Sequence, residues 1–302
     1  MQVMTVLGPI APEELGVTQT HEHLVLNLKR ASHRLDALQN NESLIVEEVS
    51  MFRAAGGRTV VDLTNNGMGR DPLAMRRIAE ATGLHVVAGC GWYRQQHYDE
   101  SVDRTPTNEL AAEMVRELTV GIDGTDIRAG IIGEIGAEED YLTAAEERVF
   151  RAAARAHKQT GAAINTHAMG YPVGLPQLDL LQEEGVDPSR IVIGHCDHYL
   201  SLEYHEAILK RGAYVAYDNW GNLNSYPDHL KLPLLLELLR RGHERQLLLS
   251  TDTTLRGHLH AFGGHGYDHL LVKILPQLRA AGVSEEQIRI MMVENPARLL
   301  PF

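Results

Sequence analysis

Residues 190–197 read Arg190-Ile191-Val192-Ile193-Gly194-His195-Cys196-Asp197. The first half is a run of β-branched side chains, which is typical of a parallel strand that is buried on both faces. The second half changes abruptly to a histidine and an aspartate. A buried strand that ends in polar side chains recurs along this chain, and the recurrence predicts its architecture.

Eight runs of strand length share this character, at residues 17–24, 58–64, 85–93, 130–136, 162–168, 190–197, 213–220 and 246–252. Amphipathic stretches typical of helices lie between them, among them residues 44–55, 71–82, 107–120, 143–160 and 230–241. Glycines such as Gly83 and Gly161 mark helix ends. The alternation predicts an α/β fold, a (β/α)₈ TIM barrel that spans residues 1–302 as one domain. An open doubly wound sheet is the alternative.

Composition narrows the class of protein. The 302 residues carry 40 acidic and 28 basic side chains, a formal net charge of −12. This balance argues against binding to nucleic acid or to an anionic membrane surface. Cys90 and Cys196 both lie in apolar runs, so we expect reduced core residues. There is no signal-peptide pattern and no run of about 18 apolar residues. We therefore expect a cytoplasmic protein with a small-molecule substrate.

Five of the strand-like runs end in side chains that can bind metal ions. In a barrel these ends meet at one face, where the active sites of such barrels lie. An inward-facing charged side chain is costly unless it is paired or binds a metal. The sequence therefore predicts a metal centre at the C-terminal face of the strands. Its expected ligands are His21, His23, Glu134, His167, His195 and Asp252.

The number of ligands indicates two metal ions. Six protein ligands are too many for one tetrahedral catalytic zinc with an open position. They suit two divalent ions, expected to be Zn²⁺ with Mn²⁺, Co²⁺ or Fe²⁺ as alternatives, joined by a carboxylate and a hydroxide. Taken singly, each residue has another explanation. A histidine can be a buried core residue, Asp252 can cap a helix, and Glu134 can pair with Arg94.

The same strand ends resemble a known family. The motifs that carry the resemblance are Thr20-His21-Glu22-His23, residues 130–136, Thr166-His167, residues 193–197, Leu249-Ser250-Thr251-Asp252 and Glu294-Asn295-Pro296-Ala297-Arg298. They are similar to the phosphotriesterase-like family of the amidohydrolase superfamily, and most of all to its branch of phosphotriesterase homology proteins. The resemblance implies a barrel with a binuclear centre, usually of zinc. His21, His23 and Asp252 would hold the buried metal, and His167 and His195 the exposed one. Asp252 would accept the proton of the attacking hydroxide.

Three departures from the family pattern indicate which branch of the family the chain resembles. Many members bridge their metals with a carboxylated lysine on strand 4, where this chain has Gly133, so Glu134 is the expected bridge. Successive side chains of a strand point to opposite faces, so Glu134 would point away from the face that position 133 occupies. We therefore expect a bulge or twist there. The proton relay of the phosphotriesterases would map to Asn219 and His198, so it is absent or altered. Tyr93 matches a lactonase position, but Asn219 stands where those enzymes have arginine.

Residues beyond the metal ligands are expected to shape a substrate pocket. They are Trp92, Tyr93, Arg94, Asn219, Trp220 and Arg256. The loop at residues 253–267 adds His258, His260 and His265, which with Arg256 could meet an anionic group. The alternative is that these loop residues are merely solvated.

The function expected from the sequence is a metal-dependent hydrolase acting on ester bonds. A metal-bridging hydroxide would attack an ester, lactone or phosphoester. Two alternatives stay open at this point: organophosphate phosphotriesterase as the main activity, or a non-catalytic barrel that binds metal or ligand. The altered proton relay indicates that any hydrolysis of phosphotriesters would be a promiscuous side activity and not the main one. A homodimer, common in the family, is a further open expectation.

Overall fold

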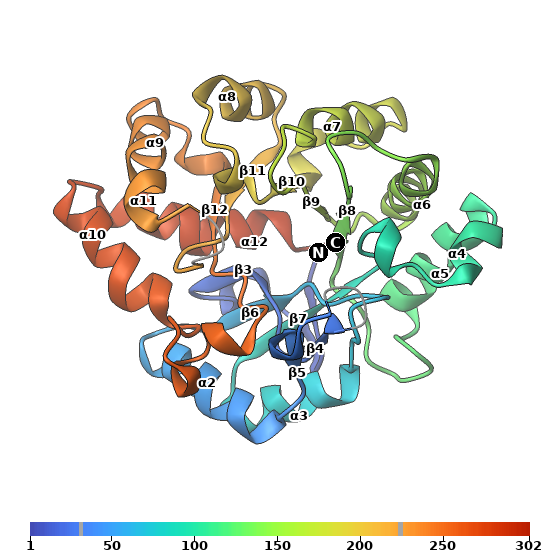
Figure 1. Cartoon of the computed structure of the whole chain (residues 1–302), viewed down its shortest axis with the longest axis horizontal. Coiled ribbons are helices and arrows are strands. Elements are labelled where there is room, and N and C mark those ends of the chain that lie inside the picture. Colours follow the sequence, from blue (N-terminus) through green and yellow to red (C-terminus); the bar gives the residue numbers. More distant parts are fainter. Residues whose placement is uncertain (30–32, 223–225) are drawn as a thin grey trace.

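The computed structural model describes residues 1–29, 33–222 and 226–302. Eight parallel strands form one curled sheet, in the order β12-β11-β10-β9-β8-β7-β6-β3, with helices around its outside (Figure 1). This confirms the predicted (β/α)₈ TIM barrel. The strands of the barrel are β3 (Thr18–Glu22), β6 (Thr59–Asp62), β7 (His85–Cys90), β8 (Ile131–Gly136), β9 (Ile164–His167), β10 (Ile191–Gly194), β11 (Tyr214–Tyr217) and β12 (Leu247–Leu249).

Each barrel strand lies inside one of the eight runs expected from the sequence. Both faces of each strand are buried, so its sequence is almost continuously apolar and stands out from the helices. Side chains such as Val61, Ile131 and Val192 fill the inside of the barrel. A larger apolar cluster joins the outer faces of the strands to the helices. Cys90 and Cys196 are free and buried, as expected.

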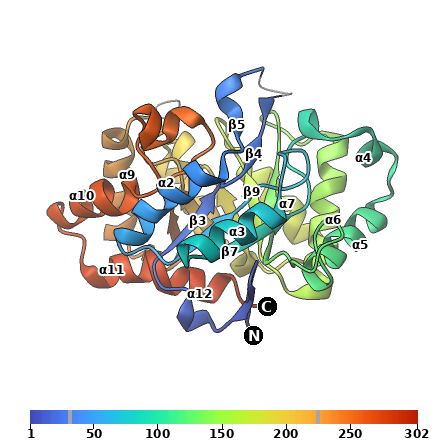
Figure 2. The ribbon, with the colours of Figure 1, turned by 90° about the horizontal axis from the view of Figure 1, so that it is seen from below.

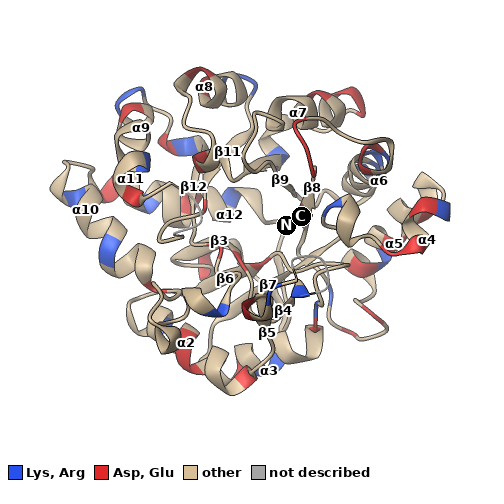
Figure 3. Cartoon of the chain, viewed as in Figure 1, with Lys and Arg blue, Asp and Glu red and all other residues tan. Residues whose placement is uncertain are grey.

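The helices follow the amphipathic stretches. They are α2 (Glu42–Ala54), α3 (Pro72–Thr82), α4 (Glu100–Arg104), α5 (Thr107–Thr119), α6 (Ala144–Thr160), α7 (Gly174–Glu183), α8 (Leu202–Lys210), α9 (Asp228–Arg240), α10 (Leu275–Ala280), α11 (Glu285–Arg289) and α12 (Asn295–Leu299). Side chains cap several first turns: Asn41 accepts from the backbone N–H of Leu44, and Asp71 accepts from that of Ala74. Acidic and basic side chains are interspersed over the outer helices (Figure 3). No helix in the described part of the chain is both long and apolar enough to cross a membrane.

Two small hairpins mark the two ends of the barrel. The hairpin of β1 (Val3–Thr5) and β2 (Gly8–Ile10) lies at the end where both termini lie. The pair β4 (Leu26–Asn27) and β5 (Leu38–Gln39) projects at the opposite end (Figure 2). The projecting pair therefore stands at the end where the barrel strands finish.

The seam between β3 and β12 is closed by polar contacts. The backbone N–H of Asp252 donates to the carbonyl of His21 at 3.2 Å. The buried carboxylate of Glu22 accepts from the hydroxyl of Ser250 and from the backbone N–H of Thr251, both at 2.7 Å. These bonds tie the first and last strand ends together and so fix the positions of the side chains that follow.

The expected irregularity on β8 is present. Its pairing with β9 shifts register between Ile132 and Ile135. Gly133 has a φ of +137°, and a Cβ there would lie 2.4 Å from the carbonyl oxygen of Asn165. Position 133 therefore cannot carry a lysine without rearrangement, and the next residue, Glu134, is the one on β8 that has a carboxylate.

Candidate metal centre

The six side chains expected to bind metal lie together at the C-terminal face of the barrel. Each stands at or just beyond a strand end: His21 and His23 with β3, Glu134 in β8 and His167 in β9. The other two, His195 and Asp252, follow β10 and β12. Counted over the whole residue, backbone included, all six are at least 93% buried.

Glu134 lies at the middle of this group. Its Oε1 is 3.4 Å from Nε2 of His23. Its Oε2 is 2.8 Å from Nδ1 of His167 and 3.3 Å from Nε2 of His195. On the other side, Oδ1 of Asp252 is 3.2 Å from Nε2 of His23. One carboxylate thus faces both halves of the cluster, which is the position of a bridging ligand.

The donor atoms fit divalent cations. Nε2 of His21, Nε2 of His23 and Oδ1 of Asp252 are buried and have no hydrogen-bond partner. Buried polar atoms without partners are rare because each one costs free energy. Within the described residues, ligand atoms of two triads, His21-His23-Asp252 and Glu134-His167-His195, lie within 4.8 Å of one another. Imidazole and carboxylate are the ligands that Zn²⁺, Mn²⁺, Co²⁺ and Fe²⁺ accept.

Two of the alternative explanations for single residues, those for Glu134 and Asp252, do not hold in the structure. Arg94 lies 3.5 Å from Glu138, so Glu134 is not its ion-pair partner. The next helical turn after Asp252 begins at Arg256 and is preceded by Leu255, so Asp252 caps no helix.

Asp218 is a central residue that sequence reasoning missed. It follows β11, and its two oxygens accept from Nδ1 of His21 and Nδ1 of His195, both at 2.9 Å. These bonds fix the tautomers that leave Nε2 of both histidines able to face a metal. Although Asp218 forms a third possible ligand group with the same histidines, its oxygens are already used in this way. The sequence did contain a signal for Asp218, because this residue directly follows the apolar strand β11, just as the other site residues stand at strand ends.

The other imidazoles are oriented by different partners. Nδ1 of His23 lies 2.9 Å from the hydroxyl of Thr64. His167 turns Nδ1 towards Glu134, and its Nε2 is 3.5 Å from the hydroxyl of Tyr93. His167 would therefore present Nδ1 to a metal, whereas His21, His23 and His195 would present Nε2.

Burial and charge shift the pKa values of the cluster in opposite directions. Burial lowers the pKa of His23, but the nearby carboxylates of Asp252 and Glu134 outweigh it and raise the pKa to about 10. Asp218 raises the pKa of His195 to about 10 against the same burial. Burial and the neighbouring His195 lower the pKa of His167 to about 3. Without a cation, His23 and His195 therefore carry extra protons at neutral pH, which a metal would displace, whereas His167 is neutral.

A buried ion pair stabilises the segments that follow β10 and β11. Nζ of Lys231 is 3.3 Å from Oδ2 of Asp197, and both side chains are fully buried. The same oxygen accepts from the backbone N–H of Asn219 at 3.0 Å. The Asn219 side chain then contacts Nδ1 of His195 at 2.9 Å and Oδ1 of Asp218 at 3.0 Å. Asn219 thus belongs to the support of the metal ligands.

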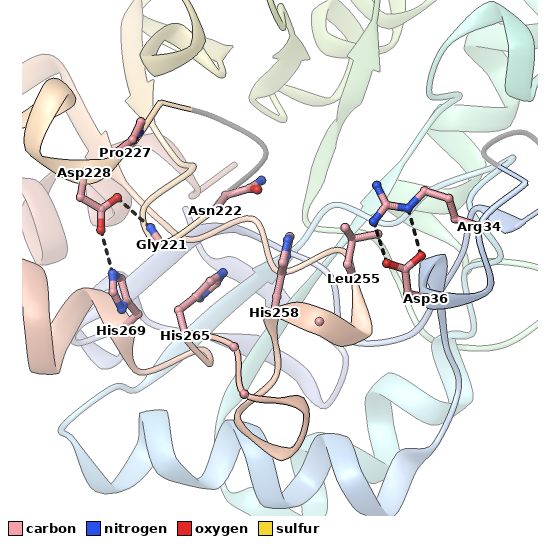
Figure 4. Close-up of a pocket in the computed structure, with 13 residues that line it drawn as sticks. Arg34, Asp36, Gly221, Asn222, Pro227, Asp228, Leu255, His258, His265 and His269 are labelled. Atoms are coloured by element: carbon pink, nitrogen blue, oxygen red, sulfur yellow. Dashed lines mark hydrogen bonds and ion pairs between the residues drawn. The ribbon is translucent and has the colours of Figure 1, made fainter.

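A cavity of about 480 Å³ lies on the same face, lined by loops that follow β4, β11 and β12 (Figure 4). Of the residues expected in a pocket, Trp92 and Tyr93 are almost completely buried, and the guanidinium of Arg94 lies 4.6 Å from the ring centre of Tyr93. None of the six expected pocket residues is among the described residues that line this cavity, and two of them have clear reasons. Trp220 is fully buried in the apolar core and so forms no open wall. Arg256 donates to the carbonyl of Leu38 at 2.7 Å and does not line the cavity.

The chain is similar to several known proteins over almost its whole length. The model of the phosphotriesterase family matches residues 1–300. A crystal structure of the phosphotriesterase homology protein from Escherichia coli, complexed with phosphate in the active site, is 41% identical, with a TM-score of 0.93 over 95% of this chain and 99% of that one. A lactonase from Listeria monocytogenes is 29% identical, with a TM-score of 0.96 over 100% of this chain and 99% of that one. The N-acetyltaurine hydrolase of Tetraodon nigroviridis is 32% identical over 100% of this chain and 98% of its own length.

Proposed function

The chain belongs to the phosphotriesterase family of metal-dependent hydrolases, and we propose that it cleaves a carboxyl ester, lactone or amide bond at the histidine and carboxylate cluster. The observation that carries this proposal is the set of buried, unpartnered atoms on His21, His23 and Asp252 beside the central Glu134. The names of two relatives, a lactonase and an N-acetyltaurine hydrolase, support carbonyl substrates of these kinds.

Each ligand has a distinct part in the proposed centre. His21, His23 and Asp252 would hold one divalent cation, His167 and His195 would hold the other, and Glu134 would bridge the two. When bound, such ions lower the pKa of a water molecule and polarise the C=O or P=O group of a substrate. Zinc is the ion we propose first, because imidazole and carboxylate suit it well.

Asp252 is the residue that we propose as proton acceptor. Its side chain is 11% exposed, whereas those of His21 and His23 are fully buried, so it stands at the edge that substrate and water reach. Burial raises the pKa of Asp252, but the nearby imidazole of His23 and the charges of the histidines outweigh it and lower the pKa. An ionised carboxylate at this edge can take the proton of an attacking water and pass it to the leaving group.

Phosphoesters are the second candidate substrates. The relative from Escherichia coli has phosphate in its active site, which shows that a similar site accepts a tetrahedral phosphorus oxyanion. We propose that hydrolysis of organophosphate triesters is a promiscuous activity here. Asn219 is engaged with His195 and Asp218, and it cannot relay a proton as a histidine would.

The test combines metal analysis with a hydrolysis panel. The purified chain is loaded with Zn²⁺, Mn²⁺ or Co²⁺, its metal content is counted, and lactones, aryl esters, N-acyl amides, phosphotriesters and phosphorylated lactones are assayed. We expect two ions per chain and turnover of a carbonyl substrate that exceeds that of every phosphotriester. Two bound ions with no turnover above an Asp252→Asn control would favour the non-catalytic barrel instead.

A further inference from the structure

Arg94 is a mostly buried cation beside the metal cluster. It stands in the segment that follows β7, and its side chain is 16% exposed. Burial lowers the pKa of its guanidinium, but Tyr93, Glu138 and Glu134 outweigh this and raise the pKa, so the group stays charged. A charged group that is largely removed from water needs partners, because each missing hydrogen bond to it costs free energy.

The guanidinium of Arg94 has few partners. Its Nε is buried without a hydrogen-bond partner, whereas Nη1 and Nη2 keep contact with solvent and donate no hydrogen bond to a described residue. Nη1 is 3.5 Å from Oε1 of Glu138, an oxygen that already accepts from Nε2 of Gln96 at 2.7 Å. By contrast, Arg70 donates to the two oxygens of Glu117 at 2.8 and 2.7 Å. A buried structural arginine thus pairs closely in this protein, while the terminal nitrogens of Arg94 remain available.

Several contacts link Arg94 to the metal ligand His167. The guanidinium of Arg94 lies 4.6 Å from the centre of the Tyr93 ring. The centre of the same ring is 4.9 Å from that of the His167 ring, and the Tyr93 hydroxyl is 3.5 Å from Nε2 of His167. At the end of β8, a Cβ on Gly136 would lie 2.7 Å from Cβ of His167 and 3.0 Å from Cγ of Arg94. The two side chains therefore flank the same glycine, and Tyr93 packs against both.

Arg94 lies on the exposed edge of the cluster, as Asp252 does. The side chains of Arg94 and Asp252 are 16% and 11% exposed, whereas that of His23 is fully buried. Burial raises the pKa of the Tyr93 hydroxyl, and the charges of Arg94, Glu134 and Asp252 act on it as well, so this hydroxyl lies among the three groups. A substrate that comes from solvent to the metal ligands therefore meets both Arg94 and Asp252.

We propose that Arg94 determines specificity by binding an anionic oxygen group of the substrate, a carboxylate, sulfonate or phosphate, while the scissile bond lies at the metal cluster. Nη1 and Nη2 donate to two oxygens of that group, because the planar fork of a guanidinium matches the spacing of such oxygens. Glu138 competes for the same nitrogens when no substrate is bound. The proposal rests on the proposed hydrolase function, and it moves the expected anionic group from Arg256 and the loop histidines to Arg94.

Rigid aryl esters test the proposal. One series comprises acetoxybenzenesulfonate, acetoxybenzoate, acetoxyphenylphosphonate and neutral acetoxybenzamide, and a mirrored series of phenyl benzoates carries the same groups on the acyl side, each in meta and para forms. In at least one series, Arg94→Met should lower kcat/KM for an anionic ester by about tenfold or more relative to the amide, mainly through KM, because the group binds away from the reacting atoms. Unchanged ratios throughout, or an equal loss for the amide, would overturn the proposal.

Further variants assign the effect to the guanidinium. Arg94→Lys keeps the charge without the fork and should retain part of the preference for the anionic ester. Glu138→Gln removes the competing carboxylate and should raise the anionic-to-neutral ratio by about two- to fivefold, as loss of an exposed ion pair allows; a fall in that ratio would contradict the competition. Arg104→Met is the matched control, because Arg104 is 80% exposed and pairs with Glu100 at 3.3 Å. An equal loss of preference in this control would refute the assignment.

A binding measurement separates this proposal from the proposed function. The probes are 3- and 4-acetylbenzenesulfonate, ketones that cannot be hydrolysed, with the matching acetylbenzamides as neutral controls. Calorimetric titration of the zinc-loaded protein should give a dissociation constant about tenfold lower for a sulfonate than for its amide, and Arg94→Met should abolish the difference. If no ester is hydrolysed, the proposed function fails. The Arg94 proposal fails separately if sulfonates and amides bind alike, or if the difference survives in Arg94→Met.

Discussion

Replacement of Asp218 by asparagine should weaken one metal position and spare the other. Oδ1 of Asp218 accepts from Nδ1 and the backbone N–H of His195 and from Nδ2 of Asn219. Oδ2 accepts from Nδ1 of His21 at 2.9 Å and shares the backbone N–H of His195 at 3.2 Å. An asparagine would keep its oxygen at the three-donor side, and its NH₂ group would then face Nδ1 of His21. Two donors cannot pair, so His21 must move its proton to Nε2, the atom that should bind metal.

The magnitude follows from the bond that is lost. A hydrogen bond to a charged group contributes about 1.5–3 kcal/mol, and loss of a partner behind a metal-binding histidine typically costs about 10–100-fold in affinity. We therefore expect Asp218→Asn to weaken the metal held by His21 and His23 by about 10–100-fold, while the metal held by His167 changes little.

Competition with a chromophoric zinc chelator measures both affinities, with metal content counted in parallel. Asp126→Asn is the control, because that carboxylate is 83% exposed and pairs with Arg76. Two unchanged dissociation constants in Asp218→Asn would refute the role given to Asp218. Equal weakening of both metals would refute the assignment of the lost bond to His21.

Four further predictions address the rest of the site. Glu134→Ala should leave clearly fewer than two metals per chain, because none of the five lysines lies on β8 to replace the bridge; two retained metals would refute the bridging role. Asp252→Asn should keep most of the metal yet lower kcat by about 10²–10⁴-fold, the usual contribution of a general base; an unchanged kcat would exclude proton acceptance. His23 and His195 have pKa values of about 10 without metal. Zinc binding at pH 7.5 should therefore release protons, and the affinity for zinc should rise as the pH rises towards about 10. Calorimetry in two buffers of different ionisation enthalpy measures this release, and identical heats would contradict it. Lys231→Met should lower the free energy of unfolding by about 3–5 kcal/mol, since a fully buried carboxylate loses its partner; urea denaturation that shows less than about 1 kcal/mol would argue against that pairing.

The sequence by itself determined the barrel and the kinds of ligand atoms. A run such as Ile191-Val192-Ile193 forms a doubly buried strand wherever it is placed, because its composition is a local property. The rule that barrel strands finish at one face then brought His21 and Asp252 together without coordinates. The shift at Glu134 was also foreseeable, since Gly133 offers no side chain.

Only the tertiary structure decided which side chains support, cover and extend the site. Asp218 and His21 are 197 residues apart, and no local pattern predicts that they share a hydrogen bond. Trp220 ends an apolar run like a pocket residue, yet packing within the large apolar cluster buries it completely. Arg94 and His167 likewise meet only because their side chains flank the same glycine, Gly136, at the end of β8. Residue type and periodicity set strands and ligand chemistry, whereas pairing, burial and tautomer depend on contacts that form only when distant segments meet.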